Sequence, residues 1–212
     1  MTCKLCSNEH LTKIEDIQMK NTYYQCKNCD FIFSKNLPNI EQEQQQYSNH
    51  NNSIENEGYV QMFQDFINFA ITPFTDKTKP LLEFGSGPGP VLSHLLKQKD
   101  FNVQIYDPIY ANDCSWKHKK FNTIISTEVF EHLHKPKESI KELLNSLDAG
   151  GTLAFQTIFH PQNEEKFLKW WYRRDPTHVG FFSHITLEKM QDVFDLELLK
   201  FDEKNIAVFK KL

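Results

Sequence analysis

An apolar stretch that runs directly into a glycine-rich turn, LLEFGSGPGP from position 81, restricts the possible folds of this chain more than any other feature. The apolar residues predict a buried strand, and Gly85, Gly87 and Gly89 allow a sharp turn that brings the backbone close to a ligand. Glu83, near the end of the strand, can accept a hydrogen bond from a cationic or hydroxyl donor. The dinucleotide fingerprint GxGxxG requires glycine where this chain has Pro90, which argues against a nicotinamide cofactor.

Predicted strands and helices alternate along the chain from residue 80. Strands are expected at 80–84, 101–107, 121–126 and 152–158, and helices at 91–98 and 136–147. This alternation predicts an α/β, Rossmann-like fold, in which helices cover both faces of a mostly parallel sheet. Two last strands, at 196–201 and 206–212, are joined by only four residues, so they must form an antiparallel hairpin.

Two more helices are predicted at either end of this region. Residues 58–74 have apolar side chains at helical spacing, which predicts a helix that covers the sheet or the site. Residues 186–194 predict a helix with Thr186 as its N-cap. Lys189 at its third helical position rules out a full capping box.

Asp107 ends the second strand of the region, eighteen residues after Gly89. A carboxylate there can accept hydrogen bonds from both hydroxyls of a ribose. With ExGxGxG from Glu83 and the final hairpin, it makes residues 58–212 resemble class I S-adenosylmethionine-dependent methyltransferases. The resemblance implies that the glycine turn lines the methionine part of the cofactor, that Glu83 supports the turn or the amino group, and that Asp107 binds the ribose. The cofactor contacts expected are Glu83, Gly85, Ser86, Gly87, Gly89, Asp107, Pro108 and Thr127. The alternative is a glycine turn that only reverses the chain.

The chain departs from this family between Asp107 and Phe121. Only 13 residues separate them, and a helix of mean length plus a strand needs about 16 residues before any loop. We therefore expect the third strand and its helix to be missing or vestigial. Ile109, Tyr110 or Trp116 would then form the adenine wall in place of the family's usual acid.

Three ionisable residues follow the strand at 121–126, in TEVFEHL. If Glu128 opens a helix, Glu131 and His132 lie on the same helical face, at the carboxyl end of the sheet beside the methyl group. Two acids at a helix N-terminus also compensate the helix dipole without any further function, but a histidine cation there opposes that dipole.

A later loop, RRDPTHVGFFS, presents His178 after the extended turn that Pro176 imposes. ExxEH followed by a loop histidine resembles metal-assisted O-methyltransferases of ubiquinone biosynthesis and of small-RNA 3'-terminal 2'-O-methylation. The resemblance implies that a divalent ion such as Mg²⁺ or Mn²⁺ is held by Glu128, Glu131, His132 and His178.

Such an ion would bind the acceptor hydroxyl, lower its pKa and orient the oxygen towards the methyl group. We expect His178, His132 and Glu128 to be the catalytic residues. In a metal-free version of the site, His178, or else His160, would be the general base. A structural role for the cluster is the third interpretation.

The run WWYRR at 170–174 has two interpretations. It could stack a planar acceptor or a sugar, with Arg173 or Arg174 bound to an anion. Equally, Trp170 and Trp171 could pack inside the domain while the arginines are solvated.

Four of the five cysteines form two CxxC pairs near the N-terminus, 19 residues apart. Each pair lets two thiolates reach one ion from a single tight turn, so Cys3, Cys6, Cys26 and Cys29 predict a closed, structural zinc site of the zinc-ribbon type. Two disulfides or four free thiols are the alternatives, and a reducing cytoplasm disfavours disulfides. Short strands are expected at 22–26 and 30–34, whereas Cys114 is an idle or buried thiol.

The chain is thus predicted to contain a zinc-ribbon module at 1–38, a polar linker or mobile flap at 39–57 and a methyltransferase domain at 58–212. No apolar run reaches the length of about 20 residues that spans a bilayer, and the N-terminus lacks the order of a signal peptide, so no membrane partner and a cytoplasmic location are expected. The net charge of -4 argues against a nucleic-acid partner without excluding a local basic patch.

The function predicted is S-adenosylmethionine-dependent O-methylation of a hydroxyl on a small molecule or on a sugar or nucleoside unit. A metal-free C- or N-methyltransferase is the alternative within enzymes. The alternative of another class is a zinc-ribbon binding protein whose methyltransferase-like domain is not catalytic.

Overall fold

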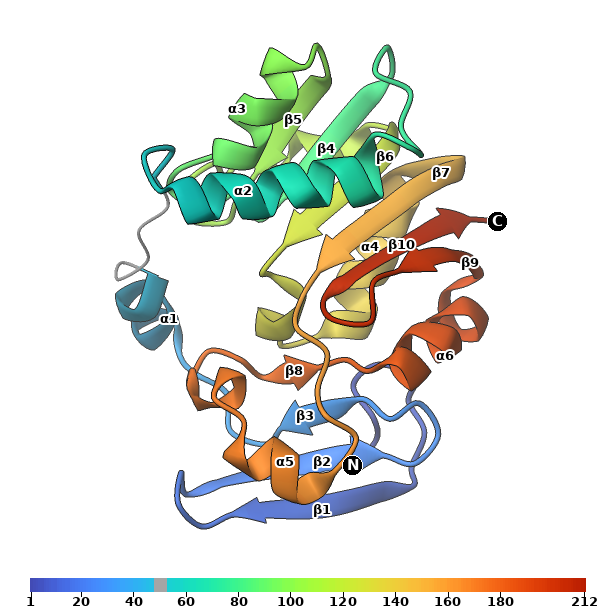
Figure 1. The fold of residues 1–212 in the computed structure, drawn as a ribbon. Coiled ribbons are helices and arrows are strands. Elements are labelled where there is room, and N and C mark those ends of the chain that lie inside the picture. Colours follow the sequence, from blue (N-terminus) through green and yellow to red (C-terminus); the bar gives the residue numbers. More distant parts are fainter. Residues whose placement is uncertain (48–52) are drawn as a thin grey trace.

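Two β-sheets organise the computed structural model, which describes residues 1–47 and 53–212 (Figure 1). The larger sheet has six strands in the order β5-β4-β6-β7-β10-β9. Strands β4 to β7 are parallel, and β10 runs antiparallel to both of its neighbours, which confirms the predicted sheet and its hairpin. The strands are β4 (Pro80–Phe84), β5 (Asn102–Tyr106), β6 (Phe121–Thr127), β7 (Leu147–Gln156), β9 (Leu196–Phe201) and β10 (Ile206–Lys211).

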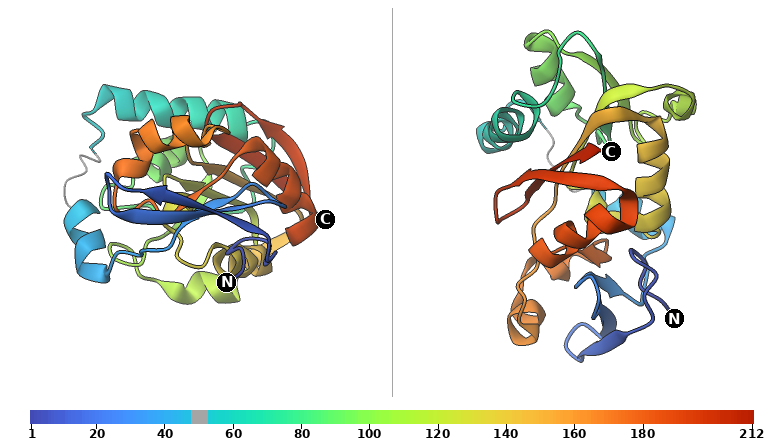
Figure 2. Two further views of the ribbon diagram at one scale, coloured as in Figure 1. Left: turned by 90° about the horizontal axis from the view of Figure 1, so that it is seen from below. Right: turned by 90° about the vertical axis from the view of Figure 1, so that its right-hand side faces the viewer.

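Helices cover both faces of this sheet because its central strands are apolar on both sides. Leu81 and Ile125 face α2 (Glu57–Phe66), its continuation as a π-helical turn, and α3 (Val91–Gln98). Their neighbours Leu82 and Ile124 face the opposite core, with α4 (Pro136–Ser146) and α6 (His184–Phe194). Figure 2 shows α2 and α3 on one side of the sheet and α4 on the other. None of the described helices is both long and apolar enough to cross a membrane.

The segment between β5 and β6 is shortened, as predicted. It contains an isolated bridge from Asp107 to Ala111 and a short 3-10 helix at Cys114–His118. Trp116 in this helix is 1% exposed and packs against the rings of Phe84 and Tyr106. The expectation that Trp116 walls the adenine is therefore wrong, since its indole is part of the core.

The smaller sheet joins the N-terminal segment to a short strand late in the chain. Its order is β1-β2-β3-β8, and all pairs are antiparallel. Strands β1 (Leu11–Asp16), β2 (Asn21–Cys26) and β3 (Ile32–Ser34) come from the cysteine-rich segment, whereas β8 (Gly180–Phe181) follows His178. Neither β1 nor β8 was predicted. The division into domains at 1–38, 39–57 and 58–212 stays a prediction, and the pairing of β3 with β8 joins its first and last parts.

The predicted linker contains a helix, α1 (Ile40–Tyr47). Linker residues 48–52 lie outside the described residues. Asn39 and Gln42 cap the helix reciprocally: each backbone N–H donates to the other side chain at 2.9 Å. This local cap explains how so polar a sequence can begin a helix. The helix has no buried residue of its own. A further short helix, α5 (Glu164–Lys169), follows β7.

Helix α6 begins three residues earlier than predicted. Ser183 is its N-cap, and Thr186 occupies the third helical position. Thr186 N donates to Ser183 Oγ, and Ser183 N donates to Thr186 Oγ1. The predicted N-cap at Thr186, and the predicted lack of a capping box, are wrong because a threonine hydroxyl here replaces the usual acid or amide.

Candidate functional site

A cavity of about 710 Å³ opens where the parallel strands end. Its walls come from the turns after β4, β5 and β6, from the start of α2 and from α1. The carboxyl ends of parallel strands are the usual ligand-binding edge of such sheets. Of the residues predicted for the site, those that line the cavity are Glu83, Gly85, Ser86, Gly87, Asp107, Pro108, Thr127, Glu128, Glu131, His132 and His178. Gly89 is not among the lining residues, whereas Ile109 and Tyr110 are.

The glycine turn is held in a conformation that needs glycine. Gly85 and Gly87 have φ angles of +83° and +66°. A Cβ atom at Gly85 would lie 2.3 Å from a methyl carbon of Val129, so the turn and the chain after β6 approach each other closely. Gly85 N donates to Tyr106 O at 2.7 Å, which joins the turn to β5.

The Asp107 carboxylate joins the glycine turn to the loop after β5. Its Oδ2 accepts from Gly87 N at 2.9 Å, and its Oδ1 accepts from Ile109 N at 2.9 Å and Tyr110 N at 3.0 Å. A carboxylate has about four acceptor positions. The side chain therefore organises this part of the cavity and keeps acceptor capacity for a ligand; its ribose contact stays a prediction.

At the glycine-turn end of the cavity, two buried polar atoms have no partner among the described residues, namely Glu83 Oε2 and Ser86 Oγ. Burial raises the pKa of Glu83 to about 8. Buried polar groups are almost always hydrogen-bonded, so these atoms fit a polar ligand. The ammonium group and hydroxyls of S-adenosylmethionine have the donors that this arrangement requires.

The chain after β6 does not begin the helix that was predicted at Glu128. Glu128 has a φ angle of +54°, and only a 3-10 turn at Phe130–His132 follows. Pro136 begins α4 soon afterwards and disfavours the helical conformation at Lys135, so an α-helix has no room to form. A positive φ in a residue other than glycine is uncommon and often marks functional sites.

The turn nevertheless brings three potential ligands together. Atoms of Glu131, His132 and His178 that could bind a metal all lie within 4.8 Å of one another. His132 Nδ1 is 2.9 Å from Thr177 O, and His178 Nδ1 is 2.7 Å from Tyr172 O. Because a carbonyl can only accept, both Nδ1 atoms carry a proton, and in a neutral ring the Nε2 atom then has the lone pair. Burial lowers the pKa of His132, which favours the neutral ring that a metal requires.

Tyr172 connects this group to Glu128. Its hydroxyl donates to Glu131 Oε1 at 2.5 Å and lies 3.2 Å from Glu128 Oε2. Glu128 itself is outside the three-residue group, and its place among the ligands stays a prediction. Burial and the neighbouring acids raise the pKa of both Glu128 and Glu131. Glu131 Oε2 has no partner among the described residues, so a cation is the ligand this end of the cavity favours.

Tyr172 was not predicted as a site residue, although it lies in the WWYRR run. Its neighbour Arg173 is 2% exposed and forms an ion pair with Asp16 of β1, so its charge is already neutralised. Trp170 packs against Phe181, whereas Trp171 is 65% exposed. The run is therefore mainly structural.

His160 lies between the two sheets and does not line the cavity. Its Nε2 is 3.0 Å from Asp30 O, and its Nδ1 is 3.1 Å from Pro161 O. Of the three predicted histidines, His178 and His132 are the two that line the cavity.

The four N-terminal cysteines gather in one place, and all five cysteines, which lie in the described part of the chain, are free. Cys3 Sγ is 3.6 Å from Cys29 Sγ, and Cys6 Sγ is 3.5 Å from Cys26 Sγ. A tetrahedral ion with Zn–S distances of about 2.3 Å holds its sulfurs about 3.8 Å apart. The hydrogen bond from Cys29 lowers the pKa of Cys3 to about 5, so a thiolate forms readily here. The donor set fits zinc, whereas Cys114 is exposed and distant from it.

No curated protein matches the chain. Among solved structures, an O-methyltransferase family 2 protein from Planctomyces limnophilus, in complex with apigenin, is 11% identical with a TM-score of 0.54, over 81% of this chain and 62% of its own. An O-methyltransferase family protein from Burkholderia thailandensis is 8% identical with a TM-score of 0.51, over 74% of this chain and 58% of its own. A third structure, LaPhzM, is 13% identical with a TM-score of 0.50, over 74% of this chain and 57% of its own.

These likenesses show the fold, and the chain spans only about three fifths of each of those proteins, from 57% to 62%. The family model described as a methyltransferase domain matches residues 55–200. That match covers more than half of the chain and includes the glycine turn, Asp107 and the Glu131 group. The chain therefore belongs to the methyltransferase-domain family of enzymes.

Proposed function

We propose that this protein transfers a methyl group from S-adenosylmethionine to a hydroxyl of a small molecule or of a sugar or nucleoside unit, with a divalent ion held by Glu131, His132 and His178. One observation carries the proposal. Ligand atoms of Glu131, His132 and His178 lie within 4.8 Å of one another in the cavity that the glycine turn lines, and Glu131 Oε2 has no partner in the described part of the chain.

The cofactor would lie along the turn after β4. Glu83 and Ser86 would contact its amino-acid part, and Asp107 its ribose, as the unpartnered atoms and the cavity lining favour. Ile109 and Tyr110 would border the adenine. The methyl group would then point towards the chain after β6, where Thr127 and Glu128 line the cavity.

The acceptor end would be organised by the residues around Tyr172. A divalent ion, Mg²⁺ or Mn²⁺, supplies Lewis acidity that lowers the pKa of an acceptor hydroxyl. The backbone carbonyls of Thr177 and Tyr172 orient the two histidine rings, as partners of metal-bound histidines commonly do. Tyr172 holds Glu131 in place, and Glu128 completes the wall on the cofactor side.

The zinc-ribbon module would have a structural role. Its four thiols form a closed set that leaves no position for a substrate. We propose that zinc stabilises the small sheet, which is too small to hold a core of its own.

A metal-free enzyme is the second candidate, because a neutral His178 ring, which lines the cavity, would also suit a general base. The acceptor could then be carbon or nitrogen. A non-catalytic binding protein is disfavoured because Glu83 Oε2 and Ser86 Oγ have no partner among the described residues. In a domain that binds no cofactor, these buried atoms would stay without a hydrogen bond.

Binding measurements on this 212-residue chain test the proposal. We expect S-adenosylmethionine to bind by calorimetry, and one Mn²⁺ to bind per chain by electron paramagnetic resonance. Glu131→Gln keeps an acceptor for Tyr172 but removes the charge, so Mn²⁺ binding should be lost. Glu188→Gln, at an exposed acid on α6, is the matched control.

Two results would contradict the proposal. Failure to bind S-adenosylmethionine would favour the non-catalytic protein. Full methyl transfer after chelation, in a sample that still contains its zinc, would favour the metal-free enzyme, and methyl label recovered on carbon or nitrogen would overturn the hydroxyl assignment.

A further inference from the structure

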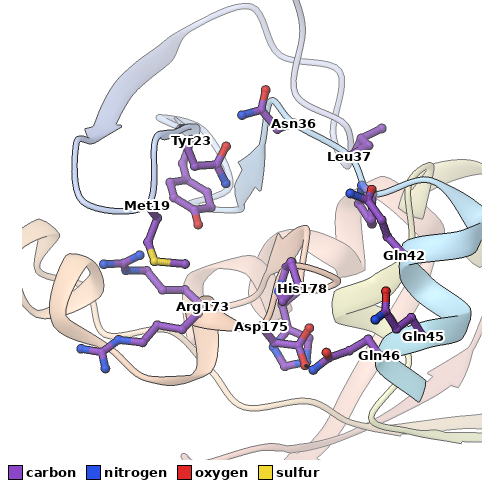
Figure 3. A pocket seen from close by; sticks show the side chains of 14 residues that line it. Met19, Tyr23, Asn36, Leu37, Gln42, Gln45, Gln46, Arg173, Asp175 and His178 are labelled. Atoms are coloured by element: carbon purple, nitrogen blue, oxygen red, sulfur yellow. Dashed lines mark hydrogen bonds and ion pairs between the residues drawn. The ribbon is translucent and has the colours of Figure 1, made fainter. Parts of the chain in front are cut away.

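A second cavity, of about 390 Å³, lies beside the candidate site (Figure 3). Its walls come from the small sheet, from the chain after β3, from α1 and from residues 173–176. Among the described residues, His178 is the one that lines both this cavity and the larger one. A molecule in the second cavity can therefore extend to the ring that we assign to the acceptor end of the site.

Helix α1 is a wall common to both cavities. Gln42, Gln45 and Gln46 line the second cavity, and Figure 3 shows them opposite Met19 and Tyr23 of the small sheet. Glu43 and Tyr47, on another side of the same helix, line the larger cavity. Because α1 has no buried residue, its position depends on such contacts with the site and with whatever fills the cavities.

The buried charge in this second cavity is already neutralised. Arg173 uses its whole guanidinium group: Nε donates to Phe167 O, one terminal nitrogen pairs with Asp16, and the other donates to Leu168 O. An anionic ligand would find no unpaired buried cation here. Arg174, the other arginine of the lining, is exposed.

The acid of the lining is satisfied in the same way. Asp175 Oδ1 accepts from the Thr177 backbone N–H at 2.8 Å and from its hydroxyl at 2.5 Å. Asp175 Oδ2 accepts from Gln46 Nε2 at 2.8 Å, which joins the loop to α1. A cationic ligand would therefore compete with three existing hydrogen bonds and with the His178 ring, whose Nε2 lies 4.0 Å from Asp175 Oδ2.

Side-chain amides are the commonest polar groups of this lining, which includes five carboxamides: Asn21, Asn36, Gln42, Gln45 and Gln46. Some are already engaged, since Asn21 bonds to Ser34, Gln42 Oε1 accepts from Asn39 N, and Gln46 Nε2 donates to Asp175. An amide that makes one such bond keeps further donor or acceptor capacity. A carboxamide has both a donor and an acceptor, and a hydroxyl group likewise both donates and accepts. An apolar ligand would remove these groups from water without replacing their hydrogen bonds, which is unfavourable. Leu37 is 43% exposed and adds apolar surface against which a sugar ring can rest, whereas Tyr23 is only 2% exposed and packs against Phe167 and Phe181.

We infer that the second cavity binds a neutral, hydroxyl-rich group, of the class of a glycosyl unit, which forms the distal part of the methyl acceptor and reaches the site past His178. The role of this group as part of the methyl acceptor rests on the proposed function, whereas its chemistry is argued from the cavity alone.

Ligand-observed nuclear magnetic resonance with three probes tests the chemistry: methyl β-D-glucopyranoside, glucuronate and cyclohexanol, each added to this 212-residue chain. We expect saturation transfer to the neutral glucoside above the other two. Asn36→Leu should weaken that binding about fivefold, as the loss of one net hydrogen bond does. Asn102→Leu, at an exposed position on β5 far from the cavity, is the control and should change nothing.

The outcomes separate the ligand classes. Preferential binding of glucuronate that Arg174→Gln abolishes would show an anion site and overturn the inference. Preferential binding of cyclohexanol, or no binding of the glucoside to a protein that binds S-adenosylmethionine and Mn²⁺, would also overturn it.

Mn²⁺ tests the connection to the site. When bound at Glu131, it should broaden the glucoside resonances, because His178 borders both cavities. Glucoside binding without any Mn²⁺ or S-adenosylmethionine binding would reject the proposed function and leave the cavity's ligand class supported. Glucoside and Mn²⁺ binding without broadening would reject the link between the cavities.

Discussion

The four-cysteine group and the Glu131–His132–His178 group are both clusters of metal-ligating side chains, but they differ in what surrounds them. Three of the four cysteines are buried, and the four sulfurs, which lie within 4.8 Å of one another, could supply all the ligands of one tetrahedral ion. The second group has three ligands and lies on a cavity of about 710 Å³. Closed sets stabilise a fold, whereas sets with an open position can bind and activate a substrate.

A short backbone connection joins these two groups. Ser34 N, at the end of β3, donates to Val179 O at 2.9 Å, and Val179 N donates to Glu131 O at 2.8 Å. A single residue thus separates the small sheet from a proposed ligand. The two groups therefore have separate chemistry but share one backbone framework. A substitution in one group should change stability or activity without changing the other.

The largest effect is expected from Cys29→Ser. Cys29 is fully buried, and the zinc-binding free energy of such a small module is also its folding free energy. We expect the zinc to be lost and the protein to be destabilised by about 4 kcal/mol or more. Zinc content by emission spectroscopy and urea unfolding measure this.

Cys114→Ser, at the exposed fifth cysteine, should change neither quantity. A Cys29→Ser protein that still unfolds like the wild type would show that the four-cysteine group does not stabilise the small sheet.

His178→Ala should have the opposite signature. Removing its Nε2 leaves two ligands, so Mn²⁺ affinity should fall and kcat for methyl transfer should decrease by about 10²- to 10⁴-fold. Zinc content should stay at the wild-type level, since the four-cysteine group is complete without this ring. His118 is exposed at the end of the 3-10 helix before β6, and His118→Ala is the matched control.

The comparison also explains which parts of the molecule could be predicted from sequence. The four-cysteine group was predictable because each CxxC pair encodes its geometry within four residues. Strand β4 and helix α3 were predicted to the residue, since an apolar run, a glycine turn and Pro90 determine their ends locally. By contrast, β8 has two residues and exists only because β3 pairs with it.

The Glu131–His132–His178 group, here called the open group because its ligand set faces the cavity, was only partly predictable. Like β8, it depends on contacts between segments distant in sequence. Glu131, His132 and His178 were expected together, and the structure brings them together. The predicted helix at Glu128 was wrong because the constraint imposed by Pro136 and the positive φ angle outweigh the spacing argument. Tyr172 was missed, since its role appears only when the loop before His178 folds back onto two acids distant in sequence.

Glu83, at the opposite end of the cavity, shows what burial does to an acid without a metal. Its raised pKa means that the folded protein binds the proton more tightly than the unfolded chain does. The stability that this provides is fully present below the unfolded value of 4.5 and is lost as the pH rises through about 8.

We therefore expect the cofactor-free protein to lose on the order of a few kcal/mol of stability across that window, and Glu83→Gln to reduce the loss. Thermal unfolding as a function of pH measures it, with Glu188→Gln as the control. An unchanged pH profile in Glu83→Gln would show that other groups govern the loss. Added S-adenosylmethionine should oppose the loss in the wild type, because a cationic partner favours the ionised acid.

The smallest effect is expected from Ser183→Ala, which tests the connection between the two groups. Ser183 Oγ caps α6 and lies 2.6 Å from Asp30 Oδ2, next to Cys29. Losing a helix cap costs about 1 kcal/mol, which lowers the melting temperature of a protein of this size by about 2–4 °C. Ser183→Thr keeps the hydroxyl and should lose less. If Mn²⁺ affinity stays constant while the melting temperature falls, the framework transmits stability but not ligand geometry, and the separation holds. If Mn²⁺ affinity falls in Ser183→Ala and recovers in Ser183→Thr, the small sheet positions the open group, and the four-cysteine group is then part of the catalytic apparatus through β3 and β8.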